Sequence, residues 1–214
     1  MIEFDKVNFF YEGADTEGAL HDFSLKIREG ECVLICGPSG CGKTTVARMV
    51  NGLIPHYYEG TMEGKVTVAG EVVADKELYE IAQKVGTVFQ NPRSQFFCVD
   101  TTSELAFGLE NQGRNPDEIE KRMEHTVNKA KLQKLMDRNL FHLSGGEKQK
   151  LACGSVMTSD TEIVVLDEPS ANLDYTAMAD LCTMLDIWKR EKKTVCRGKG
   201  DRPYLQKSWF LWLV

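Results

Sequence analysis

The chain has 214 residues, of which 42% are hydrophobic and 27% are charged, the balance of a globular protein rather than of a disordered one. Its 26 lysines and arginines face 32 aspartates and glutamates, and the net charge of −6 argues against unaided binding to nucleic acid. The longest strongly apolar run, residues 209–214, is far shorter than the ~20 residues of a membrane-spanning helix, and the N-terminus lacks a secretory signal. These features predict a cytoplasmic chain of one domain, or of one core with an inserted lobe.

The N-terminal part of the chain is predicted to consist mostly of strands and turns. Strand patterns cover residues 2–11, 19–27, 32–36 and 84–89, with a hairpin over 64–73. The continuous apolar run 32–36 is typical of a parallel strand that is buried on both faces. Residues 44–53 are predicted to form a helix that ends near Gly52 and Pro55.

From residue 91 to about residue 149 the pattern is helical, with predicted helices over 102–111, 116–132 and 146–157. A buried strand over 163–166, an amphipathic helix over 176–191 and a strand that begins at Thr194 follow. This alternation predicts an α/β fold with parallel strands. The seven cysteines form no Cys-x-x-Cys pair and their number is odd, so we interpret them as free thiols. The four histidines are not spaced as the ligands of a metal site.

A glycine-rich loop follows the predicted strand 32–36 and leads into the predicted helix. It matches the pattern G-x-x-x-x-G-K-[ST] over Gly37-Pro38-Ser39-Gly40-Cys41-Gly42-Lys43-Thr44. Its glycines let successive backbone N–H groups turn toward a polyphosphate, while Lys43 can reach the terminal phosphates and Thr44 can bind Mg²⁺. The alternative is a chance glycine turn before a helix, but the position between strand and helix favours a nucleotide site.

Two acids, Asp167 and Glu168, come directly after the predicted buried strand 163–166. Ligands of parallel sheets bind at the carboxyl ends of the strands, so this pair is expected beside the glycine-rich loop. Asp167 is then placed to hold Mg²⁺, and Glu168 to orient and polarise an attacking water. Taken alone, two acids at a strand end are often only solvated.

A third element precedes the predicted helix 146–157 and reads Leu143-Ser144-Gly145-Gly146-Glu147-Lys148-Gln149. Its hydroxyl and free N–H groups can bind a second phosphate, or they can form only a helix cap. Together with the loop and the two acids, it resembles the signature sequence of the ATP-binding-cassette (ABC) ATPases, over about residues 1–195. The resemblance implies a P-loop NTPase parallel sheet, an N-terminal antiparallel β subdomain and a helical subdomain inserted at about 91–149.

The resemblance also assigns roles to single residues. Gln90 resembles the glutamine that links Mg²⁺, the attacking water and the transporter subunit, so the implied catalytic residues are Glu168 and Gln90 and the implied metal ligands are Thr44, Gln90 and Asp167. Tyr11 resembles the aromatic that stacks on adenine, with packing in the sheet as the alternative. Asp174 resembles the acid of the loop that reaches across a cassette dimer. The implied nucleotide-binding residues are Tyr11, Gly37, Ser39, Gly40, Cys41, Gly42, Lys43, Thr44, Thr45, Ser144, Gly145, Gly146 and Asp174.

Residues 51–60 and 89–111 resemble the energy-coupling-factor importers, which take up vitamins or transition-metal ions. In that family the segment after the glutamine receives a coupling helix of the membrane subunit. The candidates for this contact are Arg93, Phe96, Phe97 and Glu104. The two phenylalanines can equally belong to the core of the helical subdomain.

The pattern departs from the family near the end of the sequence. The resemblance implies a histidine near position 200 that contacts the γ-phosphate, yet no histidine follows His142. After Val195, charges and glycines replace an apolar strand, and their burial in a sheet would carry a large desolvation cost. We therefore treat 196–214 as an atypical tail, with the hypothesis that the reading frame departs at about Cys196 and leaves a truncated, degenerate end. The alternative is a variant with a changed partner surface. The frame hypothesis fails if neither other frame of the coding DNA restores an apolar strand and a histidine.

The leading interpretation is an ATP-binding and hydrolysing subunit of an energy-coupling-factor importer, peripheral at the cytoplasmic face of the membrane. Its partners would be a second cassette, identical or not, and a membrane subunit; its ligands would be ATP and Mg²⁺. The first alternative is a cassette that binds nucleotide without hydrolysing it and acts through a partner. A non-transport ABC ATPase is disfavoured, because only 98 residues separate Thr44 from Leu143 and they contain no coiled-coil heptads.

Overall fold

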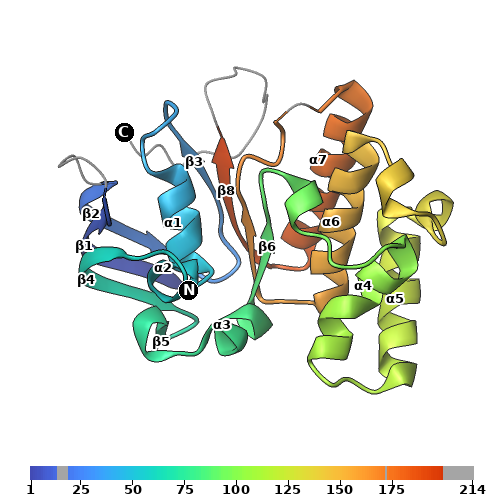
Figure 1. The fold of residues 1–214 in the computed structure, drawn as a ribbon, viewed down its shortest axis with the longest axis horizontal. Coiled ribbons are helices and arrows are strands. Elements are labelled where there is room, and N and C mark those ends of the chain that lie inside the picture. Colours follow the sequence, from blue (N-terminus) through green and yellow to red (C-terminus); the bar gives the residue numbers. More distant parts are fainter. Residues whose placement is uncertain (14–18, 172, 200–214) are drawn as a thin grey trace.

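Two four-stranded sheets organise the chain in the computed structural model, which describes residues 1–13, 19–171 and 173–199 (Figure 1). The first sheet is antiparallel, in the order β2-β1-β4-β5. Its long strand β1 pairs with β2 on one side and with β4 on the other. The strands are β1 (Ile2–Tyr11), β2 (Leu20–Ile27), β4 (Gly60–Val68) and β5 (Glu71–Val72).

The second sheet is parallel, in the order β3-β8-β7-β6. Its strands are β3 (Cys32–Cys36), β6 (Val85–Val88), β7 (Ile163–Leu166) and β8 (Thr194–Lys199). Because the strands are parallel, their carboxyl ends meet at one edge. The glycine-rich loop follows β3 at this edge, Gln90 follows β6, and Asp167 follows β7. The α/β fold predicted from the sequence is confirmed.

Helices cover both sheets and fill the segment between β6 and β7, where α4, α5 and α6 lie together on the right of Figure 1. The predicted helices 102–111, 116–132 and 146–157 match α4, α5 and α6 to within a few residues. The α-helices are α1 (Lys43–Val50), α2 (Leu53–His56), α3 (Leu78–Lys84), α4 (Thr101–Asn111), α5 (Pro116–Ala130), α6 (Gly145–Ser159) and α7 (Tyr175–Arg190). Short 3₁₀ turns are η1 (Val73–Asp75), η2 (Pro92–Ser94), η3 (Gln133–Leu135) and η4 (Leu140–His142).

Two local details differ from the prediction. The predicted helix 44–53 is interrupted, because α1 ends at Val50 and Gly52 has a left-handed backbone with φ of +79°. Helix α3 was not predicted, since its seven residues are too few to establish a helical period. Its N-terminus is fixed by a reciprocal cap, in which Glu77 N donates to the Glu80 carboxylate at 3.0 Å.

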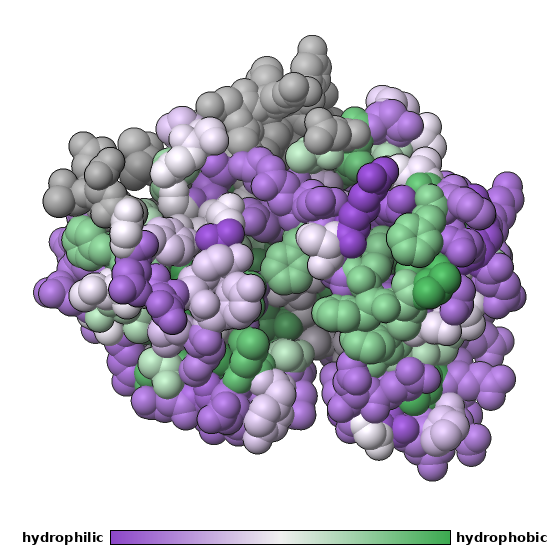
Figure 2. Space-filling view, viewed as in Figure 1, coloured by the Kyte–Doolittle hydropathy of each residue, from purple (hydrophilic) through white to green (hydrophobic). Residues whose placement is uncertain are grey.

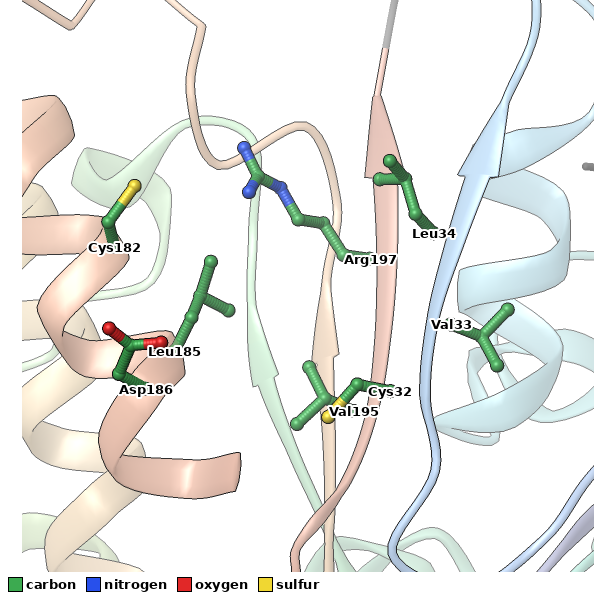
Figure 3. A pocket seen from close by; sticks show the side chains of 8 residues that line it. All are labelled: Cys32, Val33, Leu34, Cys182, Leu185, Asp186, Val195 and Arg197. Carbon is green, nitrogen blue, oxygen red and sulfur yellow. The ribbon is translucent and has the colours of Figure 1, made fainter. Parts of the chain in front are cut away.

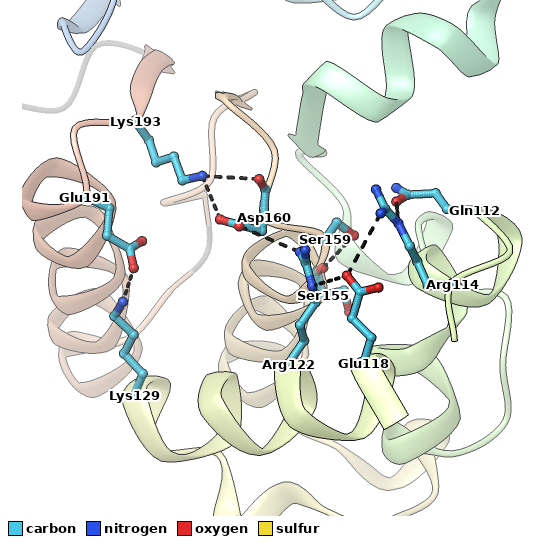
Figure 4. Close-up of polar contacts among 10 residues, drawn as sticks. All are labelled: Gln112, Arg114, Glu118, Arg122, Lys129, Ser155, Ser159, Asp160, Glu191 and Lys193. Carbon is cyan, nitrogen blue, oxygen red and sulfur yellow. Dashed lines mark hydrogen bonds and ion pairs between the residues drawn. The ribbon is translucent and has the colours of Figure 1, made fainter. Parts of the chain in front are cut away.

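Ion pairs attach α5 to the ends of α6 and α7 (Figure 4). The Asp160 carboxylate, at the end of α6, lies 3.7 Å from Arg122 of α5 and 2.7 Å from Lys193, which precedes β8. Lys129 of α5 pairs with Glu191 at the end of α7. Single exposed ion pairs contribute little, but the connected set around Asp160 and the separate Lys129–Glu191 pair hold α5 at two points along its length.

Strand β8 extends past the boundary expected from composition. The charges and glycines after Val195 were expected to lie outside the sheet. Instead, β8 runs to Lys199 between β3 and β7, and Arg197 is only 6% exposed. Figure 3 shows its side chain extending toward α7. Arg197 lines a cavity of about 90 Å³. Among the described residues, Arg197 Nε and Nη2 have no hydrogen-bond partner. The folded chain therefore bears the desolvation cost of the buried Arg197 guanidinium. Residues 200–214, which include the expected histidine position, lie outside the described residues.

Candidate functional site

The glycine-rich loop folds around the side chain of Lys43, at the N-terminus of α1. The Lys43 ammonium donates to the carbonyl oxygens of Gly37 at 2.9 Å and of Pro38 at 2.8 Å. Gly40 and Gly42 have φ of +85° and +92°, a left-handed backbone that favours glycine. A Cβ atom on Gly40 would meet no atom within 4 Å, so the loop is open at this point. Its shape fits a polyphosphate held by backbone N–H groups and a helix N-terminus.

Two other residues that the sequence predicted for the site, Lys43 and Gln90, contact Glu168. Its Oε1 lies 3.5 Å from the Lys43 ammonium, and its Oε2 accepts a hydrogen bond of 3.3 Å from Gln90 Nε2. Lys43 is 6% exposed, so this pair is shielded from solvent on the lysine side. Glu168 has a φ of +44°, a conformation that non-glycine residues rarely adopt outside functional sites. The structure therefore brings Lys43, Glu168 and Gln90 together from three separate segments.

Thr44 and Asp167 form a second contact at the same edge. Thr44 Oγ1 donates to Asp167 Oδ1 at 3.1 Å, and Asp167 is 7% exposed. Burial raises the pKa of Asp167, the Glu168 charge raises it further, and the Thr44 hydrogen bond opposes the change. Mg²⁺ is usually held by one or two protein oxygens together with substrate phosphates, and this pair of oxygens fits that requirement. Among the described residues there is no cluster of three or more metal-binding side chains that would suit a larger metal site.

The Ser144-Gly145-Gly146 segment begins α6. Ser144 Oγ accepts from Glu147 N at 3.3 Å, while Glu147 Oε2 accepts from Ser144 N at 2.8 Å, a reciprocal cap. A Cβ atom on Gly146 would lie 2.6 Å from the Cβ of Ala177, so α6 and α7 begin in close contact. No hydrogen bond or ion pair among the described residues joins this segment to the glycine-rich loop.

The loop after Glu168 leads to Asp174, the N-cap of α7. Its Oδ1 accepts a hydrogen bond of 2.8 Å from Ala177 N, so within one chain the Asp174 carboxylate caps its own helix. A hollow of about 500 Å³ lies between this loop, the segment after β6 and the start of α6. Its lining residues are Gln90, Asn91, Pro92, Arg93, Gly145, Lys148, Gln149, Ala171 and Leu173. The segment after Gln90, the start of α6 and the loop before α7 therefore adjoin one hollow.

Tyr11 lies where β1 ends and is half-buried against Phe9, with the rings edge to face at 4.8 Å. Its hydroxyl lies 3.2 Å from Thr45 Oγ1 and accepts a hydrogen bond of 3.0 Å from Arg48 Nη1. Packing in the sheet and a role beside the nucleotide are both compatible with this position. The contact with Thr45 attaches the ring to the helix that follows the glycine-rich loop.

The four candidates for a membrane-subunit contact differ in exposure. Phe97 is 76% exposed and stacks on Phe107 with centroids 4.9 Å apart, whereas Phe96 is half-buried in the helical core. Arg93 is exposed and lines a hollow of about 290 Å³ together with Phe96, Cys98, Leu140, Phe141 and Lys148. Figure 2 shows hydrophobic surface gathered over this helical part of the molecule.

Glu104 is not available for such a contact, because it is only 4% exposed. Its Oε2 accepts from the backbone N–H groups of Phe97 at 3.0 Å and Cys98 at 2.9 Å. Burial raises the pKa of Glu104, although these two hydrogen bonds oppose the change. The carboxylate fixes the loop that presents Phe97.

Replacing Glu104 by leucine is expected to reduce the free energy of unfolding by about 1–3 kcal/mol, because both backbone donors lose their acceptor. Glu104→Gln keeps one acceptor oxygen and should lose less. Urea unfolding of the three proteins measures the difference. A leucine variant as stable as the parent would show that the two N–H groups find other partners.

Sequence reasoning missed two cations beside the site, Arg48 and Lys148. Arg48 follows Thr44 and Thr45 by about one helical turn, so the spacing on α1 could have indicated it. Lys148 is 5% exposed and lines both hollows. Nothing in the local pattern distinguishes it from an exposed lysine, since its burial depends on packing against segments distant in sequence.

Comparisons with known proteins agree with this geometry. The sequence model of the family described as "ABC transporter" matches residues 20–171. An inferred ABC transporter ATP-binding protein of Treponema denticola is 46% identical over 195 residues, which is 91% of this chain and 40% of that protein. A similarly described protein of Pyrococcus horikoshii is 39% identical over 90% of this chain and 68% of its own length. The chain thus spans about 40% of the length of the first relative.

Solved structures give the same result. The protein cbiO1 of Clostridium perfringens, described as part of the ABC transporter complex cbiONQ, has a TM-score of 0.80 at 25% identity and covers 94% of this chain and 78% of its own. The ATP-binding cassette MJ0796, solved as a dimer in a post-hydrolysis state with ADP and Pi, has a TM-score of 0.79 at 25% identity, over 93% and 88% of the two chains. None of the described helices is long and apolar enough to cross a membrane.

Proposed function

The chain belongs to the ABC transporter family of ATP-binding proteins, and from this we propose that it binds and hydrolyses ATP with Mg²⁺ to drive transport across a membrane. The observation that carries the proposal is the convergence of Lys43, Thr44, Gln90, Asp167 and Glu168 at the carboxyl edge of the parallel sheet. Family membership supports ATP as the ligand, and the open glycine loop supports a polyphosphate at this edge.

The proposed mechanism uses positioning and charge more than covalent chemistry. Lys43 and the backbone N–H groups of residues 40–45 would hold the β- and γ-phosphates, and Thr44 and Asp167 would hold Mg²⁺. Bound Mg²⁺ neutralises charge that develops on the phosphates. Glu168, oriented by Gln90, would align a water with the γ-phosphate and accept its proton. Ser144, Gly145 and Gly146 would bind the nucleotide of a second cassette, since no hydrogen bond or ion pair among the described residues joins them to the glycine loop.

The binding part of the proposal is tested with Lys43→Ala and a matched control. Lys26 also pairs with a glutamate, Glu3, but at an exposed site, where its side chain is 59% accessible. We expect Lys43→Ala to weaken Mg-ATP binding about tenfold or more, because a charge-assisted hydrogen bond to phosphate is lost. Lys26→Ala should bind as the parent does. Calorimetric titration measures both; equal affinities in all three proteins would contradict the proposal.

We further propose an importer of the energy-coupling-factor type, with a membrane subunit docked on the helical segment. The resemblance of residues 51–60 and 89–111 supports this, as does the similarity to cbiO1 of the cbiONQ complex. Phe97, Val99 and Phe141 are 76%, 60% and 77% exposed, and exposed apolar surface of this kind marks interaction sites. Co-purification of a membrane protein that is lost on Phe97→Asp and Phe141→Asp, with ATP binding unchanged, is the supporting result.

A second candidate function is a cassette that binds nucleotide without turning it over and acts through an intact partner. The absence of any histidine after His142 favours it, because the family resemblance assigns the γ-phosphate contact to a histidine near position 200. The two candidates share the binding site and differ in steady-state hydrolysis.

A further inference from the structure

Arg48 of α1 joins two tyrosines beside the candidate nucleotide site. Its Nη1 donates to the Tyr11 hydroxyl at 3.0 Å, and its guanidinium carbon lies 3.9 Å from the centre of the Tyr58 ring. The same carbon is 6.0 Å from the centre of the Tyr11 ring, and the two tyrosine rings lie edge to face at 6.4 Å. A cation over an aromatic face is attracted by the ring, so Tyr58 holds the guanidinium in place.

The hydrogen bonds of Tyr11 have a defined direction. An arginine can only donate, so the Tyr11 oxygen accepts from Arg48 and its own hydrogen is free for Thr45 Oγ1, 3.2 Å away. Thr45 is 5% exposed and lies in the first turn of α1, directly after Lys43 and Thr44. The Tyr11 ring is therefore attached at its tip to the helix whose N-terminus carries the phosphate loop.

We propose that Arg48 is a positioning residue for the base of the bound nucleotide. It fixes the tilt of the Tyr11 ring through the phenol oxygen, and with Thr45 it sets the distance between the base platform and the phosphate loop. The inference rests on the proposed function, because it requires the Tyr11 ring to contact adenine. Arg48 does not contact the phosphates in this scheme and acts through Tyr11.

The test compares a ligand that has a base with one that lacks it. Dissociation constants are measured for Mg-ATP and for magnesium tripolyphosphate with the parent chain, Arg48→Met, Tyr11→Phe and the double variant. Methionine keeps most of the length of the arginine side chain, and phenylalanine keeps the ring while removing the hydroxyl. Arg28→Met is the control, since Arg28 is exposed.

We expect Arg48→Met to weaken ATP binding about three- to tenfold, the effect of one lost hydrogen bond, and to leave tripolyphosphate binding unchanged. Tyr11→Phe should lose at least as much, because it also removes the contact with Thr45. The double variant should lose no more than Tyr11→Phe alone, because both single variants remove the bond between Arg48 and Tyr11. Arg28→Met should leave both constants unchanged.

The inference alone is overturned if Arg48→Met weakens the binding of both ligands equally, which is a general effect on α1, or if it changes the binding of neither. Losses that add in the double variant also overturn it, because the two residues would then act separately. If the parent binds ATP and tripolyphosphate equally, the base contact of Tyr11 is absent and the inference falls with it. If the parent binds neither, the proposed function itself has failed.

Discussion

Replacing Glu168 by glutamine is expected to lower the rate of ATP hydrolysis by about 10²–10⁴-fold, the usual contribution of a positioned general base. Glutamine keeps the shape and can still contact Gln90 and Lys43, but it cannot accept a proton from the attacking water. ATP binding should be retained, because the phosphate contacts assigned to Lys43 and the loop N–H groups are unchanged. Steady-state phosphate release with saturating Mg-ATP, measured beside ATP affinity, gives both quantities.

Glu162→Gln is the matched control, since Glu162 is an exposed glutamate just before β7, whereas Glu168 lies just past its other end. Its rate should equal that of the parent. If the parent itself binds ATP and has no turnover above that of Glu168→Gln, the non-hydrolysing cassette is the correct function. Turnover that survives Glu168→Gln would show that another group supplies the base.

Replacing Arg197 by methionine is expected to stabilise the protein, by about 1–4 kcal/mol on the scale seen when buried ionic groups are replaced by apolar ones. The guanidinium is buried in the middle strand pair of the parallel sheet, and its Nε and Nη2 have no partner among the described residues. Burial accordingly lowers the pKa of Arg197. Methionine is unbranched and flexible, so it can follow the same path toward α7 without the charge.

Thermal unfolding measures this change, and about 1 kcal/mol corresponds to roughly 2–4 °C in Tm for a domain of this size. Arg190→Met, at the exposed end of α7, should change Tm little. A decrease in Tm for Arg197→Met would mean that the guanidinium has a partner that compensates its burial. The sign of the change in Tm therefore decides whether the Arg197 side chain destabilises or stabilises the folded protein.

The sequence predicted the parts of this molecule that depend on local pattern. The apolar runs 32–36 and 163–166 are strands because no polar face interrupts them, and the motifs at their ends follow from chain order. The partners of each strand could not be predicted, since neighbours in the sheet are distant in sequence, as β3 and β8 are. The site residues with a local motif were named in advance, and their assigned roles stay predictions.

Other features depend on packing between distant segments. Glu104 was named as a candidate membrane-subunit contact because its segment resembles that of the importers. In the structure Glu104 is buried, and it accepts hydrogen bonds from two backbone N–H groups of the preceding loop. The spacing on α1 could have indicated that Arg48 lies near the site, but its contacts with Tyr11 and Tyr58 could not be predicted, because both tyrosines lie outside α1. Arg197 was expected outside the sheet on grounds of desolvation, and the strand pairing of β8 instead keeps it inside.

The close contact between Gly146 and Ala177 restricts the sequences that this fold accepts. Any side chain on Gly146 would meet the Ala177 methyl, so neither position can enlarge unless α6 and α7 separate at their first turns. Those turns carry Ser144 and Asp174, which begin the two helices. Natural variation at positions 146 and 177 should therefore be correlated and confined to the smallest residues. This restriction holds independently of any contact that either residue makes with nucleotide.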